Sequence, residues 1–135
     1  VPILGICLGM QLLYEFSDEG WENGLSLIKG KVKKIDINDK IKYKLPNVGW
    51  RKISKINNGK LLNGINEKDN LFYFCNSYGI PYDDNLINLN TKSYFFYEAK
   101  YISIIEDKNI FGVQFHPEKS HNIGLKLLQN FIEIK

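Results

Sequence analysis

Cys7 lies between two glycines, in Gly5-Ile6-Cys7-Leu8-Gly9, and the distant segment Gln114-Phe115-His116-Pro117-Glu118 carries a histidine and a carboxylate. A thiol can act as a nucleophile, an imidazole can accept its proton, and a carboxylate can orient and stabilise the imidazole. Each segment alone is more typical of packing or of a surface turn. Together they predict a catalytic triad of Cys7, His116 and Glu118, in which the fold brings the two segments close.

The elements that must position Cys7 are a strand and a helix. Residues 1–6 form an apolar run that predicts a fully buried strand, and residues 8–16 predict a helix with one apolar face. Small residues beside a nucleophile permit the strained strand-to-helix turn that presents its side chain outward. Because helix N-termini favour negative charge, we also expect the Cys7 thiol to ionise readily.

The rest of the chain is mostly extended. Strands are predicted over residues 31–37, 47–53, 71–78, 94–105 and 109–115, and the last two form a hairpin that turns at 106–108. The final strand would carry His116 toward Cys7. Apolar residues at helical spacing predict a closing helix over 123–134. This order favours an α/β fold, in which an open sheet has an antiparallel extension.

Composition argues against several classes of function. The 135 residues suffice for one domain with its own core, and the net charge is only +3, with scattered lysines. The densest basic stretch, residues 29–44, is interrupted by acidic and apolar residues, so it predicts a solvated strand face and no nucleic-acid site. No stretch is long and apolar enough to span a membrane, and we recognise no signal peptide.

The two cysteines, Cys7 and Cys75, do not make a disulfide framework. A reactive thiol favours a reducing, cytoplasmic compartment. Cys75 alternates with apolar neighbours, which predicts an inert buried thiol. His121 has no evident partner. We expect no metal, because Cys7 and His116 lack two further ligands at zinc spacing.

The motif segments resemble the class I (triad) glutamine amidotransferases, through Gly5-Ile6-Cys7-Leu8-Gly9-Met10-Gln11 and Phe115-His116-Pro117-Glu118. Within that family the chain most resembles the glutaminase subunit of imidazole glycerol phosphate synthase. That narrower resemblance is carried by Pro46-Asn47-Val48-Gly49-Trp50, Phe72-Tyr73-Phe74, Ser77-Tyr78, Lys119-Ser120 and Gly124-Leu125-Lys126-Leu127-Leu128. It runs almost from end to end and is weakest over residues 82–97.

The resemblance implies a flavodoxin-like sheet with an antiparallel extension. Residues 1–135 would form the C-terminal two-thirds of the amidotransferase domain, without the family's N-terminal strands and helices. The absent part includes a glycine-rich loop that supplies one donor to the oxyanion. Losing one such donor typically lowers the rate by about a hundred- to a thousandfold, so we expect little or no glutaminase activity from these 135 residues alone.

The resemblance also implies the reaction, which is hydrolysis of L-glutamine to glutamate and ammonia without a cofactor. Cys7 would form a glutamyl thioester, His116 would move the protons, and Glu118 would orient the imidazole. The backbone N–H of Leu8 would supply an oxyanion donor. Residues that would line the glutamine pocket are Gly9, Gln11, Ser77 and Tyr78, the last two acting largely through their backbone. From the residues alone, Tyr78 fits simple packing equally well.

The implied partner is a separate cyclase subunit with a (β/α)8 barrel, to which the ammonia passes in a cytoplasmic heterodimer. There it would yield imidazole glycerol phosphate and an aminoimidazole carboxamide ribotide, in histidine biosynthesis. Gly49, Trp50 and Lys119 correspond to positions near that interface. A core position suits Trp50 as well as an interface does, and a solvated position is the alternative for Lys119.

One departure from the family pattern leaves alternatives open. Asn76 stands where the family usually has histidine before Ser77-Tyr78, and it keeps hydrogen-bonding capacity without a titratable ring. One alternative is a paralogous amidotransferase that supplies ammonia for surface-sugar (acetamidino) biosynthesis. Another is an inactive regulatory binding module of the same fold. The complete set of Cys7, His116 and Glu118 favours an active enzyme.

Overall fold

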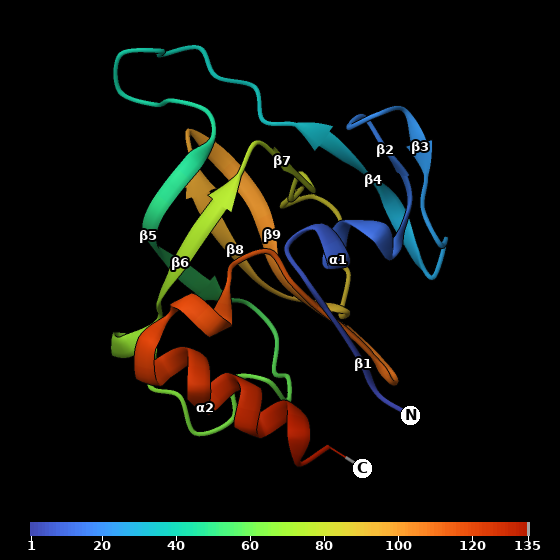
Figure 1. Ribbon diagram of the computed structural model, residues 1–135, viewed down its shortest axis with the longest axis vertical. Coiled ribbons are helices and arrows are strands. Elements are labelled where there is room, and N and C mark those ends of the chain that lie inside the picture. Colours follow the sequence, from blue (N-terminus) through green and yellow to red (C-terminus); the bar gives the residue numbers. More distant parts are fainter. Residues whose placement is uncertain (135) are drawn as a thin grey trace.

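Two β-sheets organise residues 1–134, the part of the chain that the computed structural model describes (Figure 1). The larger sheet has the order β1 (Ile3–Ile6), β10 (Ile110–Val113), β9 (Ala99–Asp107), β8 (Thr91–Tyr97), β5 (Asn47–Lys55) and β6 (Leu71–Asn76). The smaller sheet has the order β3 (Glu22–Asn23), β2 (Tyr14–Ser17), β4 (Ile28–Lys34) and β7 (Tyr78–Gly79). The fold also contains two helices, α1 (Leu8–Leu12) and α2 (His121–Ile132), and two 3-10 turns, η1 (Glu67–Asp69) and η2 (Pro117–Lys119). The predicted α/β class with antiparallel pairing is confirmed.

Strands β1 and β10, the first and last strands of the larger sheet in chain order, are parallel neighbours. β1 pairs with β10 in register, with Ile6 opposite Val113, and β10 continues antiparallel to β9. The Cys7 N–H donates to the Val113 carbonyl at 2.8 Å, which extends the pairing by one residue. Parallel strands end at the same edge of a sheet. The segments that follow β1 and β10 therefore leave the sheet at the same edge.

The predicted helix over residues 8–16 is wrong in its second half. α1 ends at Leu12, and the chain turns at Leu13 into β2, which pairs with both β3 and β4. Tyr14 is only 1% exposed and belongs to the core formed with Met10 and Val32. Strand pairing and burial of this aromatic ring outweigh the weak helical preference of the segment.

The predicted strand over residues 94–105 is two strands. Glu98 has a φ of 65°, and the chain reverses there between β8 and β9. The predicted strand over residues 71–78 is also divided, because β6 ends at Asn76 and β7 joins the smaller sheet. The predicted turn near residue 108 and the closing helix are confirmed, with Lys108 at φ 56° and α2 in place.

The larger core fixes the elements that lead to His116. Phe115 is completely buried, and its ring lies 4.1 Å from that of Phe72 on β6 and 5.7 Å from that of Phe74 (centroid distances). Leu127 of α2 is buried in the same cluster. Buried aromatic rings contribute large areas of apolar contact, about 150–250 Å2 each. This packing holds the end of β10 and the turn after it against β6.

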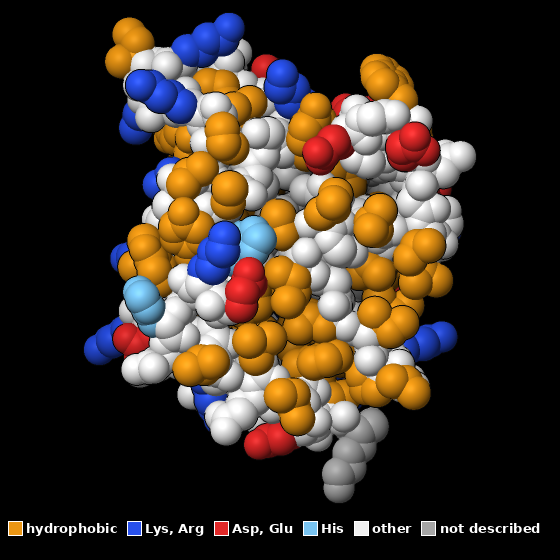
Figure 2. Space-filling view, viewed as in Figure 1, with side chains coloured by type: hydrophobic (Ala, Val, Ile, Leu, Met, Phe, Trp, Pro, Cys, Tyr) orange, Lys and Arg blue, Asp and Glu red, His pale blue; other side chains and the backbone are white. Residues whose placement is uncertain are grey.

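Strand β1 is partly exposed, which corrects the prediction of a fully buried strand. Ile3 is 51% exposed because β1 is the edge of the larger sheet and has β10 as its neighbour. Leu8 and Leu12 of α1 are also exposed, and hydrophobic side chains gather over this face in Figure 2. No helix within residues 1–134 is long and apolar enough to cross a membrane.

Candidate active site

Cys7 occupies a strained turn between β1 and α1. Its φ of 53° and ψ of −107° are unusual for a residue with a side chain, and such strain is found where structure holds a reactive group in place. Gly5 makes the turn possible, because a Cβ at this position would lie 2.5 Å from the Gly9 carbonyl oxygen. Gly9 itself has open space around its Cα. The elbow therefore requires a glycine before Cys7 and not after it.

The thiol faces a pocket of about 270 Å3 whose lining joins several predicted residues. Gln11, Ser77 and Tyr78 line it together with Cys7 and the exposed Cys75. The Cys7 Sγ lies 3.6 Å from the Cys75 carbonyl oxygen and 3.7 Å from the Nε2 of Gln114. Since Cys75 is solvent-exposed, the prediction that it is a buried thiol is wrong.

Burial raises the pKa of the Cys7 thiol above its ordinary value. The Leu8 backbone N–H lowers this pKa, as does the Gln114 amide, while the nearby Cys75 and the negative charge of Glu118 raise it. The helix that begins at Leu8 has only five residues, so its N-terminal dipole is weak compared with desolvation. The expectation that the Cys7 thiol ionises readily is therefore corrected.

We predict that alkylation of Cys7 by iodoacetamide, without glutamine, accelerates with pH beyond pH 9. Only the thiolate reacts, and the raised pKa of Cys7 keeps the thiol neutral below its ordinary value of 9.0. Mass spectrometry of the Cys7 peptide, sampled from about pH 6 to about pH 10.5, measures the rate. The Cys75 peptide in the same sample is the internal control. A plateau of the Cys7 rate near pH 7 would contradict the raised pKa.

His116 and Glu118 form a pair directly after β10. The His116 Nδ1 and a Glu118 carboxylate oxygen lie 2.8 Å apart, with the imidazole mostly buried and the carboxylate at the surface. Ser120 holds this turn to β6, because its buried hydroxyl donates to the His116 carbonyl at 2.6 Å and accepts the Tyr73 N–H at 3.0 Å. A carboxylate on Nδ1 leaves Nε2 as the nitrogen that can exchange a proton with a substrate or nucleophile.

The free edge of β6 contacts both Cys7 and His116. β6 pairs with β5 along its other edge. Along the free edge, the His116 N–H donates to the Tyr73 carbonyl at 2.8 Å, and the Cys7 thiol lies against the Cys75 carbonyl. Carbonyls two residues apart in a strand point to the same edge and lie about 7 Å apart. Cys7 and His116 are thus neighbours along β6, although no hydrogen bond joins them within the described chain.

A buried amide pair connects the Cys7 thiol to the Ser77–Tyr78 segment of the pocket. The Gln11 Nε2 donates to the Tyr78 carbonyl at 3.0 Å and to the Gln114 Oε1 at 3.3 Å, while the Gln114 Nε2 faces the thiol. Gln11 therefore uses both of its amide hydrogens inside the protein. Gln114 is completely buried, and its contact with the Cys7 thiol was not predicted from the sequence. Its position two residues before His116, directly after the strand that ends beside Cys7, was the available signal.

The carbonyls of Ser77 and Tyr78 are already occupied. The Ser77 carbonyl accepts the Ile35 N–H at 2.9 Å, and the Tyr78 carbonyl accepts from both Gln11 and Asn76. Asn76 also accepts a hydrogen bond from Asn47, at 3.1 Å, and is buried. Asn76 thus holds the pocket segment in place through its amide and needs no titratable ring for that role.

The residues predicted near a partner interface lie at the surface. Trp50 is 37% exposed, so the core alternative for it is wrong, and its indole stacks on the His121 ring at 5.0 Å and 17°. His121 therefore has a partner that its sequence context did not reveal. Lys119 is exposed, and Gly49 precedes Trp50 on β5 with a φ of 134°. The Trp50 ring also meets Tyr73 edge-on, on the strand that carries the His116 turn.

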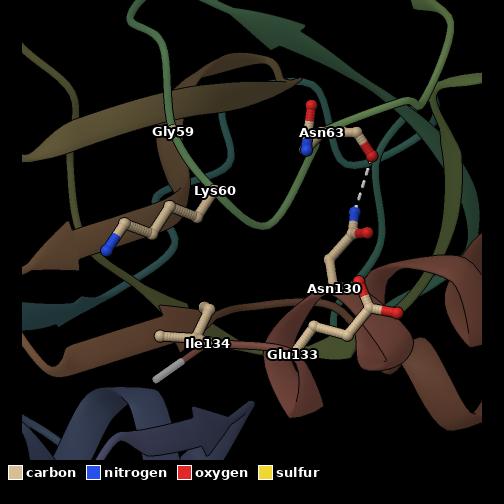
Figure 3. Close-up of a pocket in the computed structure, with 6 residues that line it drawn as sticks. All are labelled: Gly59, Lys60, Asn63, Asn130, Glu133 and Ile134. Atoms are coloured by element: carbon tan, nitrogen blue, oxygen red, sulfur yellow. Dashed lines mark hydrogen bonds between the residues drawn. The ribbon is translucent and has the colours of Figure 1, made fainter.

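A larger cavity, of about 510 Å3, lies between residues 59–63 and the end of α2 (Figure 3). Asn130 uses its amide to tie the two sides together, donating to the Asn63 carbonyl at 2.7 Å and to the Leu61 carbonyl at 2.8 Å. This cavity shares no lining residue with the Cys7 pocket. Residues 1–134 contain no group of three His, Cys, Asp or Glu side chains that could hold a metal ion.

A strained cysteine elbow beside a His–Glu pair, on a mixed sheet, is typical of triad enzymes that act on amides. The family model for glutamine amidotransferase class-I matches residues 1–134. The chain belongs to the class I glutamine amidotransferase family, as its motif segments predict.

Within this family, the chain is similar to proteins named imidazole glycerol phosphate synthase subunit HisH. It is 43% identical to the one from Pelagibacter ubique over 98% of its own length and 42% identical to the one from Methanocaldococcus jannaschii over 99%. It spans only 62% and 64% of those two proteins. The crystal structure of a Thermoplasma acidophilum protein, provisionally described as part of a GMP synthase, shares the fold with a TM-score of 0.61 and 24% identity, over 97% of this chain and 55% of that one. The predicted resemblance to the glutaminase of imidazole glycerol phosphate synthase is confirmed.

Proposed function

We propose that the protein supplies the glutaminase activity of an imidazole glycerol phosphate synthase and that Cys7, His116 and Glu118 are its catalytic residues. One observation carries the assignment. Cys7 stands on a strained elbow and shares the free edge of β6 with an imidazole that is already paired with a carboxylate. Similarity to HisH subunits at about 40% identity supports the synthase as the setting.

In the proposed reaction, His116 takes the thiol proton as the Cys7 sulfur attacks the side-chain amide carbon of L-glutamine. The amide oxygen becomes an oxyanion that accepts the Leu8 backbone N–H. The amide C–N bond then breaks, His116 gives its proton to the departing nitrogen, and ammonia leaves a glutamyl thioester on Cys7. His116 next takes a proton from water, which hydrolyses the thioester to glutamate and restores the thiol. Glu118 stabilises the imidazolium in both steps.

The raised pKa of Cys7 fits this sequence of events. The raised pKa keeps the Cys7 thiol neutral in the absence of substrate. Binding of the substrate in the pocket would align His116 with the thiol and so allow the proton transfer. Ser77 and Tyr78, which line the pocket, would border the bound glutamine, and Gln11 would act by fixing the Tyr78 carbonyl and Gln114. Gly9 does not line the pocket, and its proposed role in binding rests on the family resemblance. Hydrogen bonds between catalytic groups are often long without substrate and shorten when it binds.

Ammonia would pass to a (β/α)8-barrel cyclase subunit that makes imidazole glycerol phosphate in histidine biosynthesis. The exposed face around Gly49, Trp50 and Lys119 lies next to the His116 turn and would meet that subunit. Neutral ammonia must not escape into water, so the product side of the pocket must be covered by the partner. Co-purification of the full-length protein with such a cyclase, and turnover of the cyclase's phosphoribulosyl substrate, would test this part of the proposal.

The decisive experiment for the glutaminase assignment is labelling with the glutamine analogue 6-diazo-5-oxo-L-norleucine. In the full-length protein we expect this electrophile to modify Cys7 and to spare Cys75, because the Cys7 thiol lies near the Leu8 N–H and shares the edge of β6 with His116, the proposed oxyanion donor and base. Peptide mass spectrometry measures both sites, and excess L-glutamine should protect Cys7. Iodoacetamide, which needs no glutamine pocket, should reach the exposed Cys75 and serves as the control. Equal labelling of the two cysteines by the analogue, or labelling of neither, would count against a glutaminase.

A further inference from the structure

The Cys7 sulfur has both a hydrogen-bond acceptor and a hydrogen-bond donor as neighbours. The Cys75 carbonyl oxygen lies 3.6 Å from the Sγ, and the Gln114 Nε2 lies 3.7 Å from it. A neutral thiol can donate its proton to the carbonyl, whereas a thiolate has no proton and can only accept. The two neighbours therefore suit two different protonation states of the same sulfur.

The orientation of the Gln114 amide follows from its neighbours. The Tyr78 carbonyl can only accept, so the Gln11 amide must turn its Nε2 toward it, at 3.0 Å. The same Nε2 faces Gln114 at 3.3 Å and requires an oxygen there for its second hydrogen. The Gln114 Oε1 is therefore directed to Gln11, which leaves the Gln114 Nε2 facing the sulfur. A flipped Gln114 amide would bring two N–H groups against each other.

Burial makes this orientation hard to change. Gln114 is completely buried and Gln11 is only 5% exposed, so water cannot readily replace their hydrogen bonds. The Gln114 backbone is held as well, because its N–H donates to the Ser103 carbonyl at 2.9 Å. The Asn76 amide also donates to the Tyr78 carbonyl, at 3.0 Å, which fixes the acceptor that orients Gln11. The donor at the sulfur is thus in place without substrate.

We propose that the Gln114 amide is a catalytic group that stabilises the Cys7 thiolate, and that Gln11 is a positioning residue that keeps the Gln114 Nε2 turned to the sulfur. The inference rests on the proposed glutaminase function and deepens it. As the S–H bond breaks, the proton goes to the His116 imidazole and the electron pair stays on the sulfur. A hydrogen bond to a charged acceptor is about twice as strong as one to a neutral acceptor, so the Gln114 donor favours the thiolate over the thiol.

The charged and titratable groups near the sulfur or on the lining of its pocket come from several elements. They are Cys75 on β6, His116 and Glu118 after β10, and Glu19 and Tyr78 on the pocket lining. Burial is the largest influence and raises the pKa of Cys7, whereas the Gln114 amide lowers it. A substitution that removes this amide and leaves the titratable groups in place should therefore raise the pKa of the Cys7 thiol further.

Alkylation of Cys7 by iodoacetamide tests the inference without requiring turnover of glutamine. In the full-length protein, Gln114→Met keeps the length of the side chain and removes its donor. At about pH 8 we expect alkylation of Cys7 to slow about threefold or more, with Cys75 in the same sample unchanged. The thiolate fraction falls about tenfold for each unit of pKa, and the greater nucleophilicity of a more basic thiolate offsets part of this loss. Loosened packing would have the opposite effect, since a more exposed thiol is alkylated faster.

The kinetics of glutamine hydrolysis give a second measurement. Gln114→Met should lower kcat about tenfold or more and change KM less than about threefold, because the amide contacts the sulfur and stabilises a state formed only during the reaction. Gln129→Met is the matched control. Gln129 is exposed on α2 and does not line the Cys7 pocket, so its replacement should change neither alkylation nor hydrolysis.

Gln11→Met tests the positioning step separately. It keeps the Gln114 amide but removes the hydrogen bond that orients it, while Asn76 still donates to the Tyr78 carbonyl. Alkylation of Cys7 should slow about twofold or more. Unchanged or faster alkylation of Cys7 in Gln114→Met, or in Gln11→Met where Gln114→Met does not fold, would overturn the inference, as would an equal loss in Gln129→Met. Failure of the glutaminase assignment would instead appear as absent glutamine turnover, with the alkylation rates as expected.

Discussion

Replacement of Cys7 by serine is expected to lower glutamine hydrolysis by the full-length protein at least about a thousandfold. A serine hydroxyl is a far weaker acid than a thiol, and the buried elbow already raises the pKa of the thiol itself, so His116 could not generate the nucleophile at neutral pH. Release of glutamate, measured with the cyclase partner present, gives the rate. Because serine fits the same backbone turn, the melting temperature should change little.

Cys75→Ser is the control for this loss. The Cys7 thiol lies against the backbone carbonyl of Cys75, and that carbonyl is retained in the variant. We therefore expect Cys75→Ser to keep most of the activity. If Cys7→Ser retained more than about a tenth of the original rate, covalent catalysis by Cys7 would be excluded. If both variants lost activity equally, a redox or structural role shared by the two thiols would explain the data better.

The sequence was sufficient to predict the parts of the site that depend on local geometry. The elbow could be predicted because Gly5 lies where only a glycine fits, since a Cβ there would lie 2.5 Å from the Gly9 carbonyl oxygen. The His116–Glu118 pair could be predicted because residues two apart in a tight turn can meet directly, as they do at 2.8 Å. Both features follow from a few adjacent residues and the chemistry that they must perform.

Features that depend on distant strands could not be predicted from such patterns. Residues 14–17 have weak preferences, and their strand exists because β4, further along the chain, is available to pair. Gln114 contacts the Cys7 thiol because the parallel pairing of β1 with β10 brings the two residues together. The stacking of His121 on Trp50 likewise joins residues from β5 and α2. Long-range register, and not local composition, decides all three.

The helix α2 approaches the turn that follows His116 at a single glycine. A Cβ at Gly124 would lie 1.8 Å from the Pro117 carbonyl oxygen and 2.8 Å from the Pro117 carbonyl carbon. Both are backbone atoms of the turn that follows His116, so they cannot swing aside as a side chain could. Ser120, which holds that turn to β6, is the residue whose carbonyl accepts the Gly124 N–H at 3.2 Å. Any side chain at this position must push the helix away from the His116 turn.

Gly124→Ala is therefore expected to destabilise the protein and to impair catalysis together. Overpacking against backbone costs about 3 kcal/mol, and the better helix propensity of alanine recovers about 1 kcal/mol, leaving a net loss of about 2 kcal/mol in the free energy of unfolding. Urea denaturation measures this loss. Glutaminase activity should fall about tenfold or more at temperatures where the variant stays folded, because His116 moves relative to Cys7. Asn122→Ala, at an exposed position of the same helix, should change neither quantity. A Gly124→Ala variant that was unchanged in both would show that the helix can shift freely, and that packing of α2 does not position His116, the proposed base.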